Sequence, residues 1–228
     1  MTSGFVCPIC KGTEFSDIHG RKEAHCNGCG SVERTRIIKL LIDEVVRPKP
    51  DAKVLHIHPD PSLMPALQIM FGAGYDPVEI KSRKAVPGVR KIDPIKDLVE
   101  IAPETYDLVI HNHILQEIPG NYTVFLNRLQ MILKPGGYHL FSIPLNSGHF
   151  MENLDASMTP EQRKENFGRE KHLRRFGRAD FEQTIGIVFG LTRQYSLLDH
   201  LLSEVLLGAG VMESQWKLSS NSVFVVRR

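Results

Sequence analysis

The chain has 228 residues with 28 basic and 26 acidic side chains, which leaves a formal net charge of +2. A charge this small is no argument for nucleic-acid binding, and hydrophobic and charged fractions of 42% and 24% are ordinary for a globular protein. No uninterrupted apolar stretch is long enough to span a bilayer, so we expect no membrane-embedded segment. The length allows one sizeable core plus a small appended module.

All four cysteines lie in the first thirty residues, as the pairs Cys7/Cys10 and Cys26/Cys29. Two Cys-x-x-Cys pairs at this separation predict a zinc ribbon, in which four thiolates close a tetrahedral shell. A single iron in the same cage is the main rival metal, and two disulfides or four unrelated thiols would also be compatible with the pairs. The opening Met-Thr-Ser-Gly is neither basic nor apolar enough for a secretory leader, so we expect a reducing, cytoplasmic compartment that favours metal binding. Because a closed four-thiolate site is structural, any chemistry must lie elsewhere.

An amphipathic helix is predicted over residues 32–46, with Ser31 as its cap. Its apolar residues recur at spacings of three and four and must dock on another element: Ile37, Ile38, Leu41, Ile42 and Val45. The following Arg-Pro-Lys-Pro at 47–50 ends this helix. We therefore divide the chain into a zinc ribbon at 1–31, a connecting helix and linker at 32–50, and a main domain at 51–228.

In the main domain, short apolar runs alternate with helical patterns. Strands are predicted at 53–58, 77–82, 89–92, 106–112, 138–143, 191–197 and 222–227. Helices are predicted at 62–71, 123–133, 180–188 and 198–207. Such alternation predicts an α/β fold, a parallel sheet with helices on both faces.

Several segments carry a family resemblance. Tyr106-Asp-Leu-Val-Ile-His-Asn112, with Leu-Lys-Pro-Gly-Gly at 133–137 and Ile-Pro at 143–144, resembles the class I S-adenosylmethionine-dependent methyltransferases. The whole chain is similar to a bacterial subgroup with an N-terminal zinc ribbon, through Ser-Val-Glu-Arg at 31–34, Val-Leu-His-Ile at 54–57 and a Phe-Gly…His-Leu-Arg…Asp-Phe pattern over 167–181. The resemblance implies a Rossmann-like sheet, a structural Zn²⁺ and S-adenosylmethionine as the methyl donor.

The expected ligand crevice lies outside the carboxyl ends of the parallel strands, where the strand order reverses. With the resemblance, this rule predicts the cofactor-binding residues His56, Ile57, His58, Asp60, Glu79, Lys81, Asp93, Asn112 and His113. Asp93 is placed to accept a hydrogen bond from an adenine amino group. A purely structural role is also open for three of them: Asp60 as a helix cap, Asp93 as a turn residue and Asn112 as a strand terminator.

The chain departs from the family pattern at two places. The first loop, usually glycine-rich, is His-Pro-Asp-Pro at 58–61, and no glycine follows before Gly72. At the position of the acidic residue that binds both ribose hydroxyls stands Lys81, which cannot accept a hydrogen bond. Either Glu79 serves instead, or Lys81 meets an anionic ligand, or ribose recognition is lost.

Four histidines could gather at the crevice, two from each of two neighbouring strands: His56, His58, His111 and His113. A general base or a second metal site is one hypothesis, and two core histidines with two exposed ones is the other. A basic run lies at Arg163, Lys164, Arg169, Lys171, Arg174, Arg175 and Arg178, which a solvated helix face or an anion site would explain.

The leading hypothesis is an S-adenosylmethionine-dependent methyltransferase of unknown acceptor. His113 and Glu117 are its candidate catalytic residues, and residues 146–178 form its substrate cap. The second hypothesis is a non-catalytic scaffold on a degenerate methyltransferase fold. In that case the ribbon, the basic helix around Arg34, Arg36 and Lys39, and the basic run would hold an acidic partner such as nucleic acid.

Overall fold

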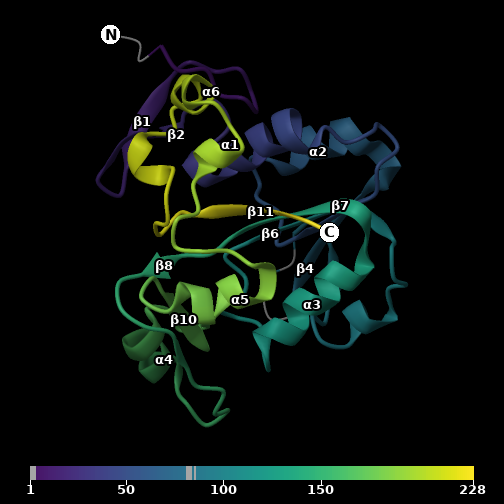
Figure 1. Ribbon diagram of the computed structural model, residues 1–228, viewed down its shortest axis with the longest axis vertical. Coiled ribbons are helices and arrows are strands. Elements are labelled where there is room, and N and C mark those ends of the chain that lie inside the picture. The colour runs from purple at the N-terminus through teal and green to yellow at the C-terminus, as the bar shows by residue number, and fades with distance from the viewer. Residues whose placement is uncertain (1–3, 81–83, 85) are drawn as a thin grey trace.

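A six-stranded sheet forms the centre of the computed structural model, which describes residues 4–80, 84 and 86–228 (Figure 1). Its strand order is β11-β7-β6-β3-β4-β5. The parallel strands are β3 (Val54–Ile57), β4 (Tyr75–Ile80), β5 (Arg90–Ile92), β6 (Tyr106–Asn112) and β7 (Leu133–Ser142), and the edge strand β11 (Val223–Arg227) runs antiparallel to β7. The predicted Rossmann-like α/β fold is confirmed.

Helices cover both faces of this sheet (Figure 1). Helix α1 (Glu33–Leu41), extended by a π-helical turn at Ile42–Val46, lies on one face with α2 (Met64–Phe71). Helices α3 (Tyr122–Ile132) and α5 (Ile185–Phe189) lie on the other. The apolar stripe of α1 contacts β7 and β11, and its central residues Ile37, Ile38, Leu41 and Ile42 are fully buried. Burial of this stripe against the sheet is what makes the helix stable.

The strand order reverses between β3 and β6. The chain runs from β3 outward through β4 to β5, then crosses back to β6 and continues to β7 on the other side. The carboxyl ends of β3 and β6 therefore diverge into connections that lead in opposite directions, which opens a crevice at this point of the sheet.

The Asp-Leu-Val and Lys-Pro-Gly-Gly segments lie at the amino-terminal ends of β6 and β7, on the side of the sheet away from this crevice. Asp107 accepts the Lys53 amide and pairs with the Lys134 ammonium at 2.8 Å. A Cβ at Gly137 would lie only 2.9 Å from the Lys134 carbonyl and 3.0 Å from that of Asp107, so glycine is required there. These motifs therefore maintain the fold.

The segment after β7 forms a cap with its own small sheet, in the order β8-β10-β9. It contains β8 (Leu145–Asn146), β9 (Met151–Glu152), α4 (Pro160–Phe167) and β10 (Arg174–Gly177). Arg174 is fully buried and holds this cap to the main domain. Its guanidinium donates to the carbonyls of Leu115, Ile118 and Gly120 and to the Glu152 carboxylate.

The C-terminal third differs most from the sequence prediction. The strand predicted at 191–197 is wrong: this segment is a turn followed by a 3₁₀ helix at Leu197–Asp199. Instead of adding a strand, buried Tyr195 accepts the Val225 amide at 3.2 Å through its hydroxyl, so a side chain satisfies an amide of β11. The helix predicted at 180–188 breaks at Thr184, and the one at 198–207 shortens to α6 (Ser203–Gly208).

The N-terminal hairpin of β1 (Phe15–Ile18) and β2 (Arg21–Cys26) lies beside α6 (Figure 1). The Val6 amide donates to the Gly208 carbonyl at 2.8 Å, which ties the N-terminal segment to the end of α6. Among the residues described, no helix combines the length and the apolar character needed to cross a membrane.

Candidate functional site

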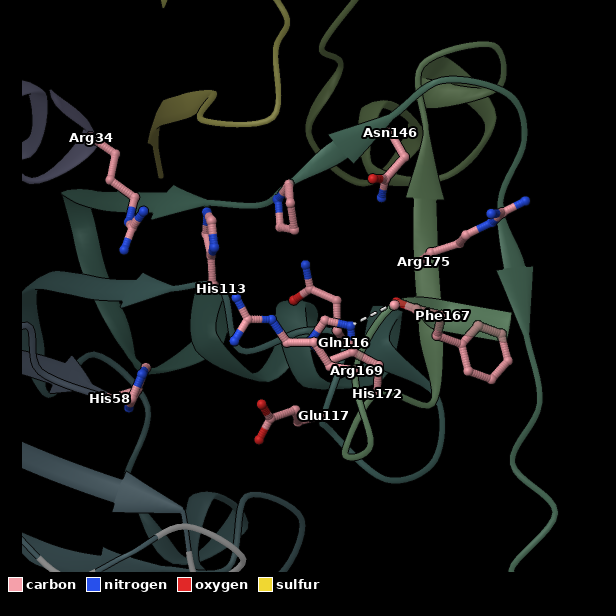
Figure 2. A pocket seen from close by; sticks show the side chains of 12 residues that line it. Arg34, His58, His113, Gln116, Glu117, Asn146, Phe167, Arg169, His172 and Arg175 are labelled. Atoms are coloured by element: carbon pink, nitrogen blue, oxygen red, sulfur yellow. Dashed lines mark hydrogen bonds between the residues drawn. The ribbon is translucent and has the colours of Figure 1, made fainter. Parts of the chain in front are cut away.

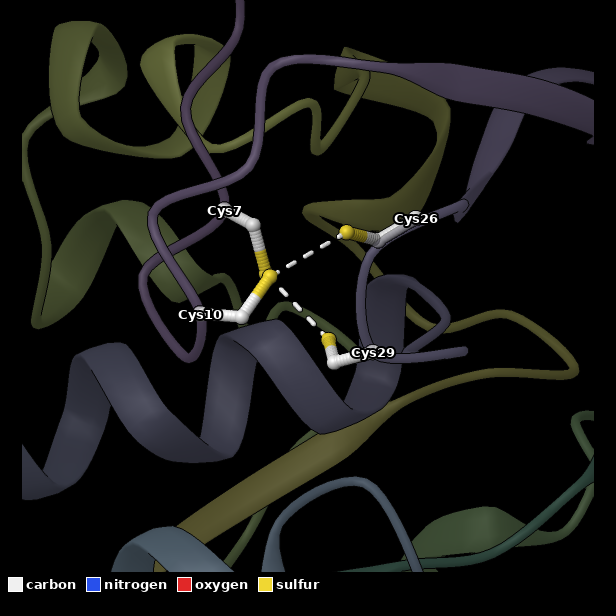
Figure 3. A group of neighbouring side chains, drawn as sticks. All are labelled: Cys7, Cys10, Cys26 and Cys29. Atoms are coloured by element: carbon white, nitrogen blue, oxygen red, sulfur yellow. Dashed lines mark hydrogen bonds between the residues drawn. The ribbon is translucent and has the colours of Figure 1, made fainter.

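The four cysteines converge on one point (Figure 3). Their sulfur atoms all lie within 4.8 Å of one another, with Cys7–Cys29 at 3.7 Å and Cys10–Cys26 at 3.6 Å. A tetrahedral Zn²⁺ with Zn–S bonds of about 2.3 Å places its sulfurs about 3.8 Å apart, so the donor set fits a metal of this size. Disulfide bonds are absent from these four residues, all of which are free thiols.

The chain leaves room for the sulfurs by placing glycine beside them. A Cβ at Gly12 or Gly28 would lie 3.3 or 3.1 Å from the Cys10 sulfur, and the Gly12 amide points at that sulfur from 3.4 Å. The expectation that Ser31 caps α1 is wrong, because its hydroxyl lies 3.2 Å from the Cys29 sulfur and 3.5 Å from that of Cys7. Val32 occupies the cap position without a side-chain hydrogen bond.

The four consecutive residues Glu33 to Arg36 in the first turn of α1 reach three other parts of the molecule and one cavity. Glu33 accepts two hydrogen bonds from Arg21 of the hairpin, at 2.8 and 3.2 Å. Thr35 donates to the Asp60 carboxylate of the first loop at 3.0 Å. Arg36 is fully buried and donates to four carbonyls, those of Ala24, Ser31, Ala209 and Gly210. The remaining residue of this turn, Arg34, faces a cavity.

That cavity has a volume of about 400 Å³ and lies at the carboxyl ends of β3, β6 and β7, under the cap (Figure 2). Three arginines, three histidines and two amide side chains are among its lining residues: Arg34, His58, His113, Gln116, Glu117, Pro144, Asn146, Phe167, Gly168, Arg169, His172 and Arg175. The cap segment 146–178 contributes half of this lining. The cavity therefore lies at the point where the strand order reverses.

Two histidines at this edge have left-handed backbone conformations. The φ angles are +55° at His58, after β3, and +47° at His113, after β6. Non-glycine residues adopt this region uncommonly and at an energetic cost, and such residues cluster at functional sites. The Nδ1 atom of His58 lies 2.6 Å from the carboxylate of buried Glu79, which fixes the ring beside the cavity. Burial lowers the pKa of His113 to about 3, and the Arg34 and Arg169 guanidiniums add to this effect.

The Pro-Asp-Pro loop uses its polar groups internally. Asp60 accepts the Ser62 amide and hydroxyl and the Thr35 hydroxyl, so its carboxylate has a structural role. It does not cap α2 as expected, because the N-cap residue of that helix is Leu63, without a side-chain hydrogen bond. The His58 amide donates to the Val78 carbonyl at 2.8 Å. Proline at 59 and 61 has no amide hydrogen to offer.

A second cavity of about 540 Å³ opens beside the first, at the ends of β4 and β5. Ile80, Asp93, Pro94 and Pro119 contribute to its largely apolar wall, and Glu117 lines both cavities. One Asp93 oxygen accepts the Ile95 and Lys96 amides, so this residue does form the predicted turn. Glu79 accepts the Ile80 amide with its second oxygen, and Lys81 lies outside the described residues.

The hypothesis that four histidines gather is wrong. His111 pairs in register with Ile57, so alternation places His111 and His56 on opposite faces of the sheet. His56 is buried against the Tyr75 hydroxyl at 2.8 Å, whereas His111 packs on Phe141 and on His139, 4.9 Å away between ring centres. Burial lowers the pKa of His56 to about 3 and that of His111 well below its usual value. In the part of the chain described, the four cysteines form the only side-chain group arranged to hold a metal.

The remaining predicted residues, Ile57 and Asn112, are not among those that line the cavity. Ile57 is fully buried, and Asn112 accepts the Ser142 hydroxyl at 2.7 Å across β6 and β7. The Asn112 Nδ2 atom is buried without a partner among the described residues.

Sequence reasoning missed Gln116 and did not resolve the basic run. Gln116 is 1% exposed, lines the cavity, and has no partner in the described chain for either side-chain polar atom. The sequence did hold a signal for Gln116. Its polar amide side chain stands three residues after His113, in a segment (114–118) whose only other polar residue is Glu117. Of the basic run, Arg174 is structural, whereas Arg169 and Arg175 line the cavity, as does the neighbouring His172.

No family model and no curated protein matches the chain. Solved structures with a similar arrangement include an S-adenosylmethionine-dependent methyltransferase from Archaeoglobus fulgidus (11% identity, 85% of this chain and 94% of that one, TM-score 0.46). A second is 1,6-didemethyltoxoflavin-N1-methyltransferase from Burkholderia thailandensis (15% identity, 69% of this chain and 67% of that one, TM-score 0.44). A third is a methyltransferase from Aquifex aeolicus (15% identity, 86% of this chain and 89% of that one, TM-score 0.41). In two further methyltransferases the match spans 34% and 36% of the other chain. Because these TM-scores are below 0.5, the fold assignment rests on the strand order.

Proposed function

We propose that this protein is an S-adenosylmethionine-dependent methyltransferase that acts on a small molecule. The observation that carries the proposal is the pair of adjoining cavities at the carboxyl ends of β3 to β7, on both sides of the point where the strand order reverses. The sequence resemblance to class I methyltransferases points to the same edge of the sheet.

The residues present fit the two ends of the donor. The apolar cavity at Ile80, Asp93 and Pro94 suits the flat adenine ring, and Asp93 borders it at the position expected for a partner of the amino group. The cavity beside His58 and Arg34 suits the amino-acid end. The ribose position fits less well, because both Glu79 oxygens already accept hydrogen bonds or pair with His58.

The donor supplies an electrophilic methyl group on a sulfonium. The contribution that we assign to the protein is positioning, since holding an acceptor in line with the methyl group accounts for most of the acceleration. His113, one of the two candidate catalytic residues, stays neutral at pH 7 because its pKa is about 3. It is therefore suited to orient an acceptor by hydrogen bonding and is a poor proton acceptor. Glu117 borders both cavities and is the better-placed base.

For the four-cysteine group we propose a structural Zn²⁺. The sulfur spacing supports a tetrahedral ion, and four thiolates leave no open position for catalysis. Elemental analysis should give one zinc per chain in a colourless protein. A red protein with one iron per chain would show that iron occupies the cage instead.

Calorimetric titration with S-adenosylhomocysteine, the demethylated donor, tests the proposed activity. We expect one site per chain, and Asp93→Ala should weaken binding about tenfold if Asp93 holds the adenine amino group. Because Asp93 also stabilises a turn, its variant should be checked for an unchanged melting temperature. Absence of binding by the wild-type protein at millimolar ligand would contradict the proposal.

A non-catalytic scaffold is the second candidate, favoured by the rigid Pro-Asp-Pro loop and by the engaged Glu79 carboxylate. It predicts steeply salt-dependent binding to RNA or DNA through the basic cap and α1. Filter binding at 50 and 200 mM salt separates the two functions, since small-molecule methyl transfer requires no such affinity.

A further inference from the structure

Three arginines line the first cavity. Arg175 points away from its centre, whereas Arg34 and Arg169 point into it from separate parts of the chain (Figure 2). Arg34 comes from the first turn of α1, and Arg169 comes from the cap loop between α4 and β10 (Figure 2). Neither has a carboxylate within ion-pair distance among the residues that the structure describes. Arg34 is partly buried, so its charge lacks both full hydration and an internal counter-charge.

Several buried polar atoms around these guanidiniums also lack partners within the described residues. They are Arg34 Nε, His113 Nε2, and both Nε2 and Oε1 of Gln116. Buried polar atoms are nearly always hydrogen-bonded, so a group of orphans around one cavity points to a ligand that supplies the missing bonds. Both charges come from guanidiniums, which stay protonated at every physiological pH.

The first loop offers an anion few donors. Its His58 amide already donates to Val78, the prolines at 59 and 61 have no amide hydrogen, and the Asp60 side chain is itself negative. Side chains are therefore the main groups that could hold an anion at this edge of the sheet. Guanidinium forks are the groups that suit carboxylate or phosphate oxygens.

We propose that Arg34 and Arg169 clamp an anionic group, a carboxylate or a phosphate, of the small molecule bound in this cavity. The inference rests on the proposed function in one respect, since it concerns the same site. The anion has two possible sources, the amino-acid carboxylate of the methyl donor or an acidic group on the acceptor. Arg34 belongs to α1, which is attached to the cysteine module (residues 4–31) through Glu33, and Arg169 belongs to the cap. A bound anion would therefore link α1 to the cap.

The test compares Arg34→Gln and Arg169→Gln with Arg178→Gln, an exposed cap residue that does not line the cavity. Each is titrated calorimetrically with S-adenosylhomocysteine and with 5′-methylthioadenosine, which lacks the amino-acid group. Separately, the melting temperature is followed in inorganic phosphate and in chloride of equal ionic strength, with and without saturating S-adenosylhomocysteine.

If the anion belongs to the donor, both cavity variants should lose about 10- to 100-fold in affinity for S-adenosylhomocysteine and none for methylthioadenosine. If it belongs to the acceptor, donor affinity stays unchanged, and phosphate should raise the wild-type melting temperature even with S-adenosylhomocysteine bound. That rise should vanish in both cavity variants and persist in Arg178→Gln. Variants that respond like the control in both experiments would overturn the clamp. A wild-type protein that binds phosphate at the clamp but no S-adenosylhomocysteine would refute only the proposed methyltransferase.

Discussion

Arg34 and Arg36 lie two residues apart on α1, yet they serve opposite purposes. Arg36 is fully buried and donates to four carbonyls, which join the hairpin, the start of α1 and the segment after α6. Arg34 turns to the cavity with a buried Nε that has no partner in the described chain. The cysteine module around Arg36 is internally satisfied, whereas the cavity around Arg34 is not. Burial and hydrogen-bond satisfaction therefore both distinguish the structural Arg36 from Arg34, for which we propose ligand binding.

Metal removal should have the largest effect on the satisfied region. The binding free energy of a structural zinc is on the order of 10 kcal/mol and is coupled to folding of the residues around it. Cys26→Ser, or treatment with a strong chelator, should therefore unfold the hairpin and lower the melting temperature of the whole protein, since Glu33 and Arg36 attach α1 to it. Circular dichroism with elemental analysis checks this outcome, and re-added zinc should reverse the chelator effect. An unchanged melting curve after complete metal loss would refute the structural role.

Acid should act on the buried histidines in and beside the central sheet. His56, His113 and His139 have pKa values of about 3, and the pKa of His111 is also lowered, in each case chiefly by burial. Their folded pKa values lie below the unfolded value of about 6.5, so the unfolded state binds more protons and stability falls as the pH drops below about 6.5. Each histidine should remove roughly 1.4 kcal/mol per pH unit. Urea unfolding between pH 7.5 and 5.5 measures the slope.

The His111→Phe variant serves as the control for the pH dependence of urea unfolding. Both His111 ring nitrogens are buried without a partner in the described residues, and the ring stacks on Phe141. The variant should be about 1–3 kcal/mol more stable at pH 7, and its pH slope should decrease by one histidine. A steeper slope, or a loss of stability at pH 7, would mean that the imidazole has a partner.

A pair of arginine variants tests the comparison of Arg34 with Arg36 most specifically. Arg36→Gln should cost about 3–5 kcal/mol, because four carbonyls lose their donors in a buried site. Arg34→Gln should change stability by less than about 1 kcal/mol, since no internal hydrogen bond is broken. Guanidinium chloride unfolding of the two variants measures the difference. Equal losses would show that Arg34 is also structural.

The sequence predicted the parts of the protein that have a strict local code. The cysteine spacing anticipated the cluster of Cys7, Cys10, Cys26 and Cys29, and the alternation of strands and helices anticipated the parallel sheet. It could not predict that buried Tyr195 would replace a strand at the sheet edge, because that choice depends on a contact with Val225 far along the chain.

The site was predictable in place and only partly in composition. The carboxyl ends of the strands located His58, Asp93 and His113, all of which border a cavity. Strand alternation could not show that His56 and His111 lie on opposite faces, since that requires the register between β3 and β6. Arg34 and Arg169 come from outside the sheet, and only the docking of α1 and of the cap brings them together.

A crystal structure of the protein with bound S-adenosylhomocysteine tests the central claim most directly. We predict the adenine ring in the cavity bordered by Ile80, Asp93 and Pro94, and the homocysteine end beside His58 and Arg34. The sulfur should point toward His113 and Gln116, where an acceptor would lie. A ligand bound away from the carboxyl ends of β3 and β6, or cavities that stay free of it at saturating concentration, would contradict the account.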